Sequence, residues 1–389
     1  MPRLPIIGIV GAGIMGSGIA QLALEAGHEV VMHDVDEPAL GRARDRIADG
    51  LTRRAAKVLD DPAGIEPWVA ARIERLRWTE ILEQLGDEAH VVIEAALESL
   101  ELKRTIFRTL DSVADPDTIL ATNTSALSIA DIAAATTHPE RVVGLHFFNP
   151  APVMRLVEVV AGPLTDPTVG TTAADLVASW GRTSVRSADS PGFIVNRVNR
   201  PFTLRALRLL EAGASSIEAI DGAIREAGFP LGPFELMDLT GIDVTFAAST
   251  AIWEALGRPD RLRPSPLQEQ LIAAGRLGRK TGAGFYRYEA GRRVEPDTAA
   301  GGSSGNLTPA ETRDRILLPI VDEAHRVAAE RVASRADIDI ALRLGAAHPI
   351  GPFERAVEEG GAASVANRLR VLARADPSLT PSDALDAAG

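Results

Sequence analysis

The sequence predicts an α/β domain built on a doubly wound sheet over residues 1–187, followed by two all-α domains over 188–289 and 309–389. Short apolar runs alternate with helical patterns as far as residue 187, which is typical of a doubly wound sheet. From residue 188 onward the pattern is mainly helical, and residues 290–308 have the composition of a flexible linker. The helical part also repeats itself, which indicates a duplicated domain.

The composition excludes several classes of protein. The chain has 389 residues, 46% hydrophobic and 24% charged, which is normal for a globular protein of two or three domains. Its formal net charge of -12 argues against nucleic acid or an anionic membrane as the main partner. The lack of cysteine excludes disulfides, cysteine–metal sites and thiol nucleophiles, and we predict no metal site. Since no apolar run is long enough to cross a bilayer and no signal peptide pattern is present, we expect a cytoplasmic protein.

The first strand–helix unit carries a glycine motif. A short apolar run leads to Gly11, Gly13 and Gly16, which satisfy G-x-G-x-x-G, and a helical pattern follows. Gly11 permits a tight turn, Gly13 lets the backbone approach a pyrophosphate, and Gly16 lets helix and sheet pack closely. The helix that follows offers free N–H groups to the phosphates, so we include its first residues, Ile14 and Met15, in the predicted cofactor site.

An acidic residue closes this unit. The next apolar run, Val30–Met32, ends at Asp34, which follows Gly16 by 18 residues. A carboxylate here accepts hydrogen bonds from adenosine ribose hydroxyls and repels a 2′-phosphate, and neither Val35 nor Asp36 supplies an arginine to neutralise one. Together with the glycine motif, Asp34 predicts a Rossmann-type domain that binds NAD rather than NADP.

Residues 38–84 form an arginine-rich insertion with long helical patterns and little strand character. Two interpretations remain open. The segment is either a solvated helical hairpin or a clamp in which Arg53, Arg54 and Lys57 bind a phosphorylated ligand.

Charged residues follow the next predicted strand, His90–Glu94. Glu98 and Lys103 come after it, and the carboxyl end of a parallel strand is where cofactors bind in such sheets. The two side chains therefore either reach the cofactor or form a solvated charge pair at a helix start.

Small polar residues follow the strand Thr118–Ala121. Asn123 and Ser125 belong to this group, and they either contact cofactor and substrate or cap the helix that begins near Ser128.

A histidine and a glutamate stand at the ends of two apolar runs in residues 141–160. His146 ends the first run, Asn149 and Pro150 follow, and the second run carries Glu158 twelve residues after the histidine. A histidine at a strand end with a carboxylate beside it forms a general base and its orienting partner. The alternative is a surface histidine and a solvated glutamate.

The helical part begins near Asp189, and Asn196 lies on its first helix. At a shift of 118 Asn196 corresponds to Asp314, so the second copy lacks this amide. The repeated residues are Arg197, Pro201, Ala206 and Asp221, which recur as Arg315, Pro319, Ala324 and Asp339, and residues 232–235, which recur as 351–354.

Six stretches together resemble the L-3-hydroxyacyl-CoA dehydrogenase family, particularly bacterial 3-hydroxybutyryl-CoA dehydrogenases with a doubled C-terminal domain. They are GAGIMGSGIAQ, ATNTSALSI, GLHFFNP, DSPGFIVNR, GFPLGPFELMDLTG and GRKTGAGFY, between residues 6 and 288. The resemblance implies a Rossmann-type doubly wound sheet and two 6-phosphogluconate-dehydrogenase-like helical domains. It also implies NAD-dependent, reversible oxidation of a short-chain (S)-3-hydroxyacyl-CoA, such as 3-hydroxybutyryl-CoA, in fatty acid β-oxidation or related metabolism.

The resemblance also assigns roles to residues. It implies that His146 is the catalytic base, that Glu158 holds its imidazole, and that Ser125 and Asn196 bind the reacting oxygen region of the substrate. The implied cofactor contacts are Asp34, Glu98 and Lys103, and the implied coenzyme A contact is Lys57. We add Asn123 and Asn149 to the predicted cofactor site and Arg54 to the predicted substrate site. One position departs from the family, since Gly50 stands where the family has a serine that contacts coenzyme A.

Two other functions are kept as alternatives. The Gly50 departure leaves room for a dehydrogenase of a free hydroxy acid such as L-gulonate on the same fold. A non-catalytic NAD-binding structural protein is the second alternative. For the assembly we expect either a monomer in which the two helical copies pair as an internal pseudo-dimer, or a homodimer.

Overall fold

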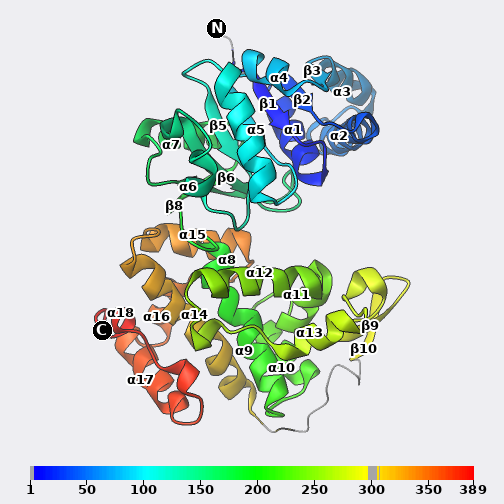
Figure 1. The fold of residues 1–389 in the computed structure, drawn as a ribbon. Coiled ribbons are helices and arrows are strands. Elements are labelled where there is room, and N and C mark those ends of the chain that lie inside the picture. The colour runs from blue at the N-terminus through cyan, green and yellow to red at the C-terminus, as the bar shows by residue number, and fades with distance from the viewer. Residues whose placement is uncertain (1–3, 297–304, 306) are drawn as a thin grey trace. The chain divides into compact units, whose positions relative to one another are not determined.

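The computed structural model describes residues 4–296, 305 and 307–389, which form two compact units divided between Ser190 and Pro191 (Figure 1). The first unit is a sheet with helices, and the second is almost entirely helical. The Rossmann-type sheet and the following all-α part that the sequence predicts are both present. The division lies three residues beyond the predicted end of the sheet domain at residue 187.

The first unit contains an eight-stranded sheet in the order β3-β2-β1-β4-β5-β6-β7-β8, in which every neighbouring pair is parallel except β6 and β7. Since β1 pairs with β2 on one edge and β4 on the other, the strand order reverses there, and such a point is where these sheets bind ligands. The strands are β1 Ile7–Val10, β2 Val30–His33, β3 Leu76–Thr79, β4 Val91–Glu94, β5 Ile119–Thr122, β6 Val142–Phe147, β7 Leu156–Ala161 and β8 Thr183–Ala188.

Seven α-helices connect these strands. The helices are α1 Ile14–Glu25, α2 Glu37–Val58, α3 Ile65–Ile73, α4 Leu82–Glu88, α5 Leu100–Val113, α6 Ile129–Ala133 and α7 Pro167–Ser179. Residues 38–84 have little strand character, as expected, but they do contain one strand, β3, that was not predicted individually. This strand has only four residues at the edge of the sheet, and the helical patterns on both sides conceal it. Ser128 caps α6, because its side chain accepts a hydrogen bond from the Asp131 N–H.

The second unit begins with α8 and contains one small hairpin. Its helices are α8 Val195–Val198, α9 Arg200–Glu211, α10 Ile217–Glu226, α11 Pro233–Thr240, α12 Ile242–Ala255, α13 Pro266–Ala273, α14 Pro309–Ala329, α15 Arg335–Gly345, α16 Pro352–Glu358, α17 Ala362–Ala373 and α18 Asp383–Asp386. Part of the predicted linker at 290–308 is in fact a strand. β10 Arg292–Pro296 pairs antiparallel with β9 Tyr286–Glu289, since Gly291 allows a tight turn with φ of 75°. Residues 297–304 and 306 lie outside the described part.

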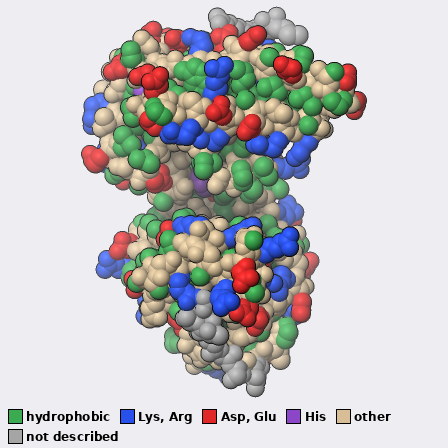
Figure 2. Space-filling model, turned by 90° about the vertical axis from the view of Figure 1, so that its right-hand side faces the viewer, with side chains coloured by type: hydrophobic (Ala, Val, Ile, Leu, Met, Phe, Trp, Pro, Cys, Tyr) green, Lys and Arg blue, Asp and Glu red, His purple; other side chains and the backbone are tan. Residues whose placement is uncertain are grey.

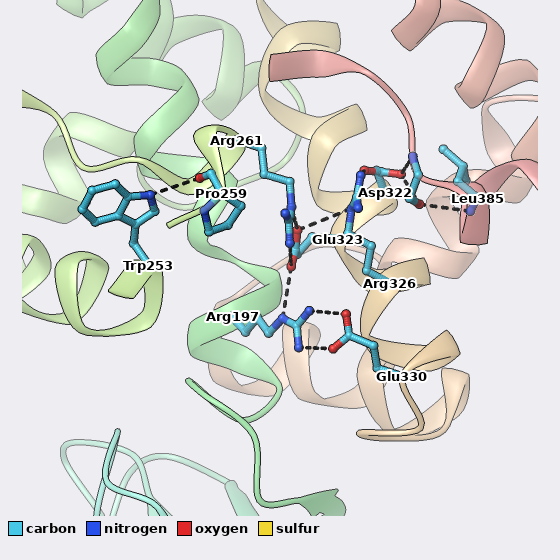
Figure 3. A network of polar contacts seen from close by, with 10 residues as sticks. Arg197, Trp253, Pro259, Arg261, Asp322, Glu323, Arg326, Glu330 and Leu385 are labelled. Carbon is cyan, nitrogen blue, oxygen red and sulfur yellow. Dashed lines mark hydrogen bonds and ion pairs between the residues drawn. The ribbon is translucent and has the colours of Figure 1, made fainter. Parts of the chain in front are cut away.

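Helix α14 packs against α9, α10, α16, α17 and α18 in this unit. Buried ion pairs join it to the first part of the unit (Figure 3). Arg197 Nε donates to Glu323 Oε1 at 3.1 Å, and the guanidinium also binds Glu330 with N–O distances of 2.5 and 2.7 Å. Arg261 Nε donates to Glu323 Oε2 at 2.8 Å. Arg197 and Glu323 are both almost fully buried, and each has a second charged partner, Glu330 for Arg197 and Arg261 for Glu323.

Acidic and basic side chains are interspersed on the face of the two units drawn in Figure 2. On this face the formal net charge of -12 is therefore not gathered into a single patch. None of the helices in the described ranges has the length and apolar character that a membrane span requires.

Candidate active site

The glycine motif forms the turn between β1 and α1. Gly11 has φ of 102°, and a Cβ atom there would lie 2.6 Å from the Ala95 carbonyl oxygen. A Cβ at Gly16 would lie 1.9 Å from the Gly11 carbonyl oxygen, so both positions require glycine. Gly13 is different, because a Cβ atom there would have no other atom within 4 Å, and the backbone is open to a ligand. The turn therefore fits a pyrophosphate held at the start of α1.

A cavity of about 860 Å³ opens beside this turn, at the carboxyl ends of β1, β2 and β4. Its walls include Gly11, Gly13, Ile14, Asp34 and Leu97. Ile14 is well exposed and lines the cavity, whereas Met15 is partly buried and packs against the core. A cavity of this size is in the range of cofactor sites.

Asp34 is held at the end of β2 by the backbone. Its Oδ2 accepts a hydrogen bond from the Ala12 N–H at 2.7 Å, and its Oδ1 accepts one from the Asp36 N–H at 3.0 Å. Arg42, which was not predicted to belong to the site, also lines the cavity and forms an ion pair with Asp36 at 3.0 Å. The i+6 separation of the two residues is not a helical contact spacing, so their pairing was not evident before the fold was known.

Glu94 at the end of β4 was also missed. It is fully buried, its two oxygens lie 2.7 and 2.8 Å from Lys103 Nζ, and Thr122 Oγ1 donates to it at 2.7 Å. Lys103 Nζ also lies 3.4 Å from Glu98 Oε2. Because the Lys103 side chain is fully buried, its described contacts are those of an internal counter-charge, and its contact with the cofactor stays a prediction.

The loop after β5 is positioned by two side chains. Glu98 Oε1 accepts hydrogen bonds from Thr124 Oγ1 at 2.6 Å and from the Ser125 N–H at 2.9 Å. Asn123 Oδ1 accepts one from the Phe147 N–H at 2.8 Å, which ties the end of β5 to the end of β6. Ser125 is exposed in this unit. Asn149, also exposed, precedes Pro150 through a cis peptide bond.

His146 and Glu158 are brought together by the antiparallel pair β6 and β7. The strand register places them directly opposite each other, and His146 Nδ1 lies 2.5 Å from Glu158 Oε2. Glu158 is fully buried and the His146 side chain is 6% exposed. The ring centroids of Phe148 and His146 lie 4.5 Å apart. A carboxylate on Nδ1 leaves Nε2 as the ring nitrogen that can exchange a proton with a ligand.

Comparison with known sequences decides the family. The profile described as "3-hydroxyacyl-CoA dehydrogenase, NAD binding domain" matches residues 6–190. The profile described as "3-hydroxyacyl-CoA dehydrogenase, C-terminal domain" matches residues 192–288 and 313–382. The chain belongs to the 3-hydroxyacyl-CoA dehydrogenase family. It is an NAD-dependent oxidoreductase, as the resemblance implied, and the glycine turn and Asp34 fit that cofactor.

Individual relatives agree with this family. The chain is 44% identical over 293 residues to the 3-hydroxyadipyl-CoA dehydrogenase of Escherichia coli, a match that covers 75% of this chain but only 61% of that protein. It is 40% identical over 283 residues to the mitochondrial hydroxyacyl-coenzyme A dehydrogenase of Rattus norvegicus, covering 72% of this chain and 90% of that one. The crystal structure of the Escherichia coli 3-hydroxybutyryl-CoA dehydrogenase superimposes with a TM-score of 0.89 at 33% identity, covering 99% of this chain and 98% of that one.

The departure from the family at Gly50 has a structural cause. A Cβ atom at Gly50 would lie 2.0 Å from Oε1 of Gln21, so a serine on α2 would require the Gln21 side chain on α1 to move. Gln21 Nε2 donates to Glu25 Oε1 at 2.7 Å, and Glu25 Oε2 lies 3.4 Å from Arg54 Nε. Arg54 is thus partly neutralised, whereas Lys57 is exposed at the end of α2. A role for either residue in binding coenzyme A stays a prediction.

Asn196, the remaining predicted site residue of this dehydrogenase, is half-buried on α8 in the second unit. Its backbone carbonyl accepts a hydrogen bond from Arg200 Nε at 3.2 Å. The predicted contact of its amide with the substrate stays a prediction. Within the described ranges, no group of three or more histidine, aspartate or glutamate side chains is arranged to hold a metal ion.

Proposed function

We propose that this chain catalyses the reversible oxidation of an (S)-3-hydroxyacyl-CoA to the 3-ketoacyl-CoA, with His146 as the base and Glu158 as its orienting partner. The observation that supports this most directly is the 2.5 Å contact between the imidazole and the buried carboxylate. A histidine fixed in this way presents one ring nitrogen in a defined direction, which proton transfer requires.

The chemistry then depends on charge that develops on His146. The unprotonated imidazole takes the proton of the substrate's 3-hydroxyl group as the C3–H bond breaks. Bound NAD supplies the hydride acceptor. The histidine becomes cationic during the reaction, and Glu158 stabilises that cation more than it stabilises the neutral ring. We assign Ser125 and Asn196 to the reacting oxygen region, and Glu98 holds the backbone of Ser125 in place.

The substrate's carrier and acyl chain are further parts of the proposal. We propose that Lys57 and Arg54 bind the phosphates of coenzyme A. We also propose that the enzyme acts in the cytoplasm, in fatty acid or related acyl-CoA metabolism. Among the relatives, one is named for 3-hydroxybutyryl-CoA and another for 3-hydroxyadipyl-CoA, so a short or medium acyl chain is favoured. The competing substrate is a free hydroxy acid such as L-gulonate. It remains an alternative because Gly50 replaces the serine that contacts coenzyme A in the family.

The deciding experiment compares NADH oxidation with acetoacetyl-CoA and NAD reduction with L-gulonate, using the purified full chain. Rapid turnover of the thioester alone supports the proposal. Turnover of the sugar acid alone would keep the cofactor and His146 but replace the substrate class. Binding of NADH, followed by its fluorescence, without turnover of either substrate would support the non-catalytic alternative.

We also propose that residues 188–289 and 309–389 are two copies of one helical domain that pair within the chain as a pseudo-dimer. Phe229 and His348 are equivalent at a shift of 119, and their rings lie 4.8 Å apart, as residues beside a two-fold axis do. At the shift of 118, α9 corresponds to residues 318–329, the C-terminal half of α14, and the two helices pack against each other. The C-terminal family profile, which matches both segments, supports the duplication.

This pairing predicts a monomer in solution. Light scattering of the full chain after size exclusion should give the mass of one chain. A dimer mass that persists on dilution would contradict the pseudo-dimer and favour the homodimer.

A further inference from the structure

Arg200 is a buried cation without a counter-ion. It begins α9, only 8% of its surface is exposed, and burial lowers the pKa of its guanidinium to about 10. It remains charged at neutral pH all the same. Its described partners are neutral, because Nε donates to the Asn196 carbonyl at 3.2 Å and Nη1 donates to Ser249 Oγ at 3.3 Å. In the described part of the chain it forms no ion pair.

Other buried arginines of this unit have carboxylates nearby. Arg355 forms no ion pair among the described residues, but the charges of Glu359 and Glu358 act on its guanidinium. Arg197 binds Glu323 and Glu330, and Arg205 Nη2 lies 2.5 Å from Asp376 Oδ2. An unpaired charge inside a protein costs several kcal/mol in stability unless something neutralises it. Arg200 is therefore unusual within its own surroundings.

The position of Arg200 connects it with the proposed substrate site. It lies four residues after Asn196, which we assign to the reacting oxygen region, and it bonds to the backbone of that residue. Ser249 Oγ donates to the Thr245 carbonyl at 2.7 Å, so its oxygen lone pairs face Arg200. A guanidinium has five N–H donors, and these two bonds use only part of that capacity.

We propose that Arg200 binds a carboxylate at the far end of the substrate's acyl chain, so that the preferred substrates are 3-hydroxyacyl-CoA thioesters of dicarboxylic acids. This inference rests on the proposed function. A terminal carboxylate supplies the missing negative charge and accepts the remaining N–H groups, which a terminal methyl group cannot do. Coenzyme A phosphates are a different source of charge, and these are assigned to Lys57 and Arg54 on the first unit.

The test uses two thioesters of equal length, 3-hydroxyadipyl-CoA and 3-hydroxyhexanoyl-CoA, which differ only in a terminal carboxylate or methyl group. The full-length enzyme should show a kcat/KM roughly 10- to 100-fold higher for the dicarboxylic thioester, the usual value of a charged hydrogen bond. Arg200→Met should abolish this preference and retain turnover of 3-hydroxyhexanoyl-CoA. Arg200→Lys should restore part of it, since the charge is kept. Arg208→Met, on the same helix, is the control and should leave the ratio unchanged.

Equal kcat/KM values for the two thioesters in the unmodified enzyme would overturn this inference and leave the proposed function intact. That comparison needs no variant, so it decides even where Arg200→Met fails to fold. A preference that survives in Arg200→Met without any reduction would also overturn it. Failure to turn over either thioester, or acetoacetyl-CoA, would refute the proposed function and this inference with it.

Discussion

His146 and Glu158 are direct cross-strand neighbours, and their relationship is set by the register of β6 and β7. The pairs Gly144–Val160 and His146–Glu158 belong to the same ladder. A slip of one residue would turn one of the two side chains to the opposite face of the sheet. Two rigid strands rather than a mobile loop therefore hold the imidazole and the carboxylate in contact.

Replacement of either member of this pair should reduce turnover by orders of magnitude. His146→Ala removes the proposed base, and Glu158→Gln keeps the shape but removes the charge that stabilises the developing imidazolium. NADH affinity, measured by fluorescence titration, should change little, because the glycine turn and Asp34 lie on other strands. A His146→Ala enzyme with near-normal kcat would refute the assignment.

Replacement of only one residue of the buried Glu94–Lys103 pair should strongly reduce the free energy of unfolding. Lys103→Met leaves a fully buried carboxylate with only Thr122 and backbone partners, and we expect a loss of about 3–5 kcal/mol in the free energy of unfolding. The double variant Glu94→Gln/Lys103→Met should lose less than Lys103→Met alone, because no unpaired charge remains. Urea denaturation of the single and double variants measures this. Additive losses would show that the two charges are not coupled.

Gly50 should be sensitive to any side chain. Gly50→Ser places its Cβ against Gln21, and we expect destabilisation of about 1–3 kcal/mol from overpacking of α1 and α2. Gly41→Ser is the matched control on the same helix, because no atom lies within 4 Å of its Cβ position, and it should be neutral or slightly stabilising. Thermal denaturation of both variants tests the close approach. Equal stability of the two variants would argue against it.

His348 should make the protein sensitive to acid. Burial, with help from Arg355, lowers the pKa of His348 to about 3 from its ordinary 6.5. Below pH 6.5 the His348 imidazole therefore binds a proton in the unfolded chain but not in the folded protein. The free energy of unfolding consequently falls as the pH falls toward 3. At pH 5 the loss should be about 2 kcal/mol relative to neutral pH.

His348→Phe tests this, since phenylalanine stands at the equivalent position, Phe229. The variant should lose about 1 kcal/mol at pH 7.5, because Asn199 Oδ1 loses its 2.8 Å contact with His348 Nε2. Its stability should then depend less on pH than that of the unmodified protein between pH 7 and 5. Parallel pH dependence of the two proteins would show that His348 is not the group responsible.

The sequence predicted the parts of the site that depend on local pattern. The glycine turn, Asp34 and the two strands that carry His146 and Glu158 follow from residue spacing and apolar runs. The buried partner of Lys103 did not follow from such a pattern, because Glu94 and Glu98 precede it by nine and five residues and only the path of the loop places Glu94 inside. Strand β10 was not predicted from the sequence because it follows a turn and borders a stretch rich in small residues, which is typical of a linker.

The buried arginines also bear on how a duplicated domain can change. On the proposed equivalence, Glu323 corresponds to Arg205, so a first domain facing a copy of itself would bring Arg197 and Arg261 against another arginine instead of a glutamate. On the proposed pairing, the two copies are complementary to each other and no longer to themselves. A gene shortened after residue 289 would then be unable to return to a two-chain enzyme by self-association, so this fusion is, in evolutionary terms, hard to reverse.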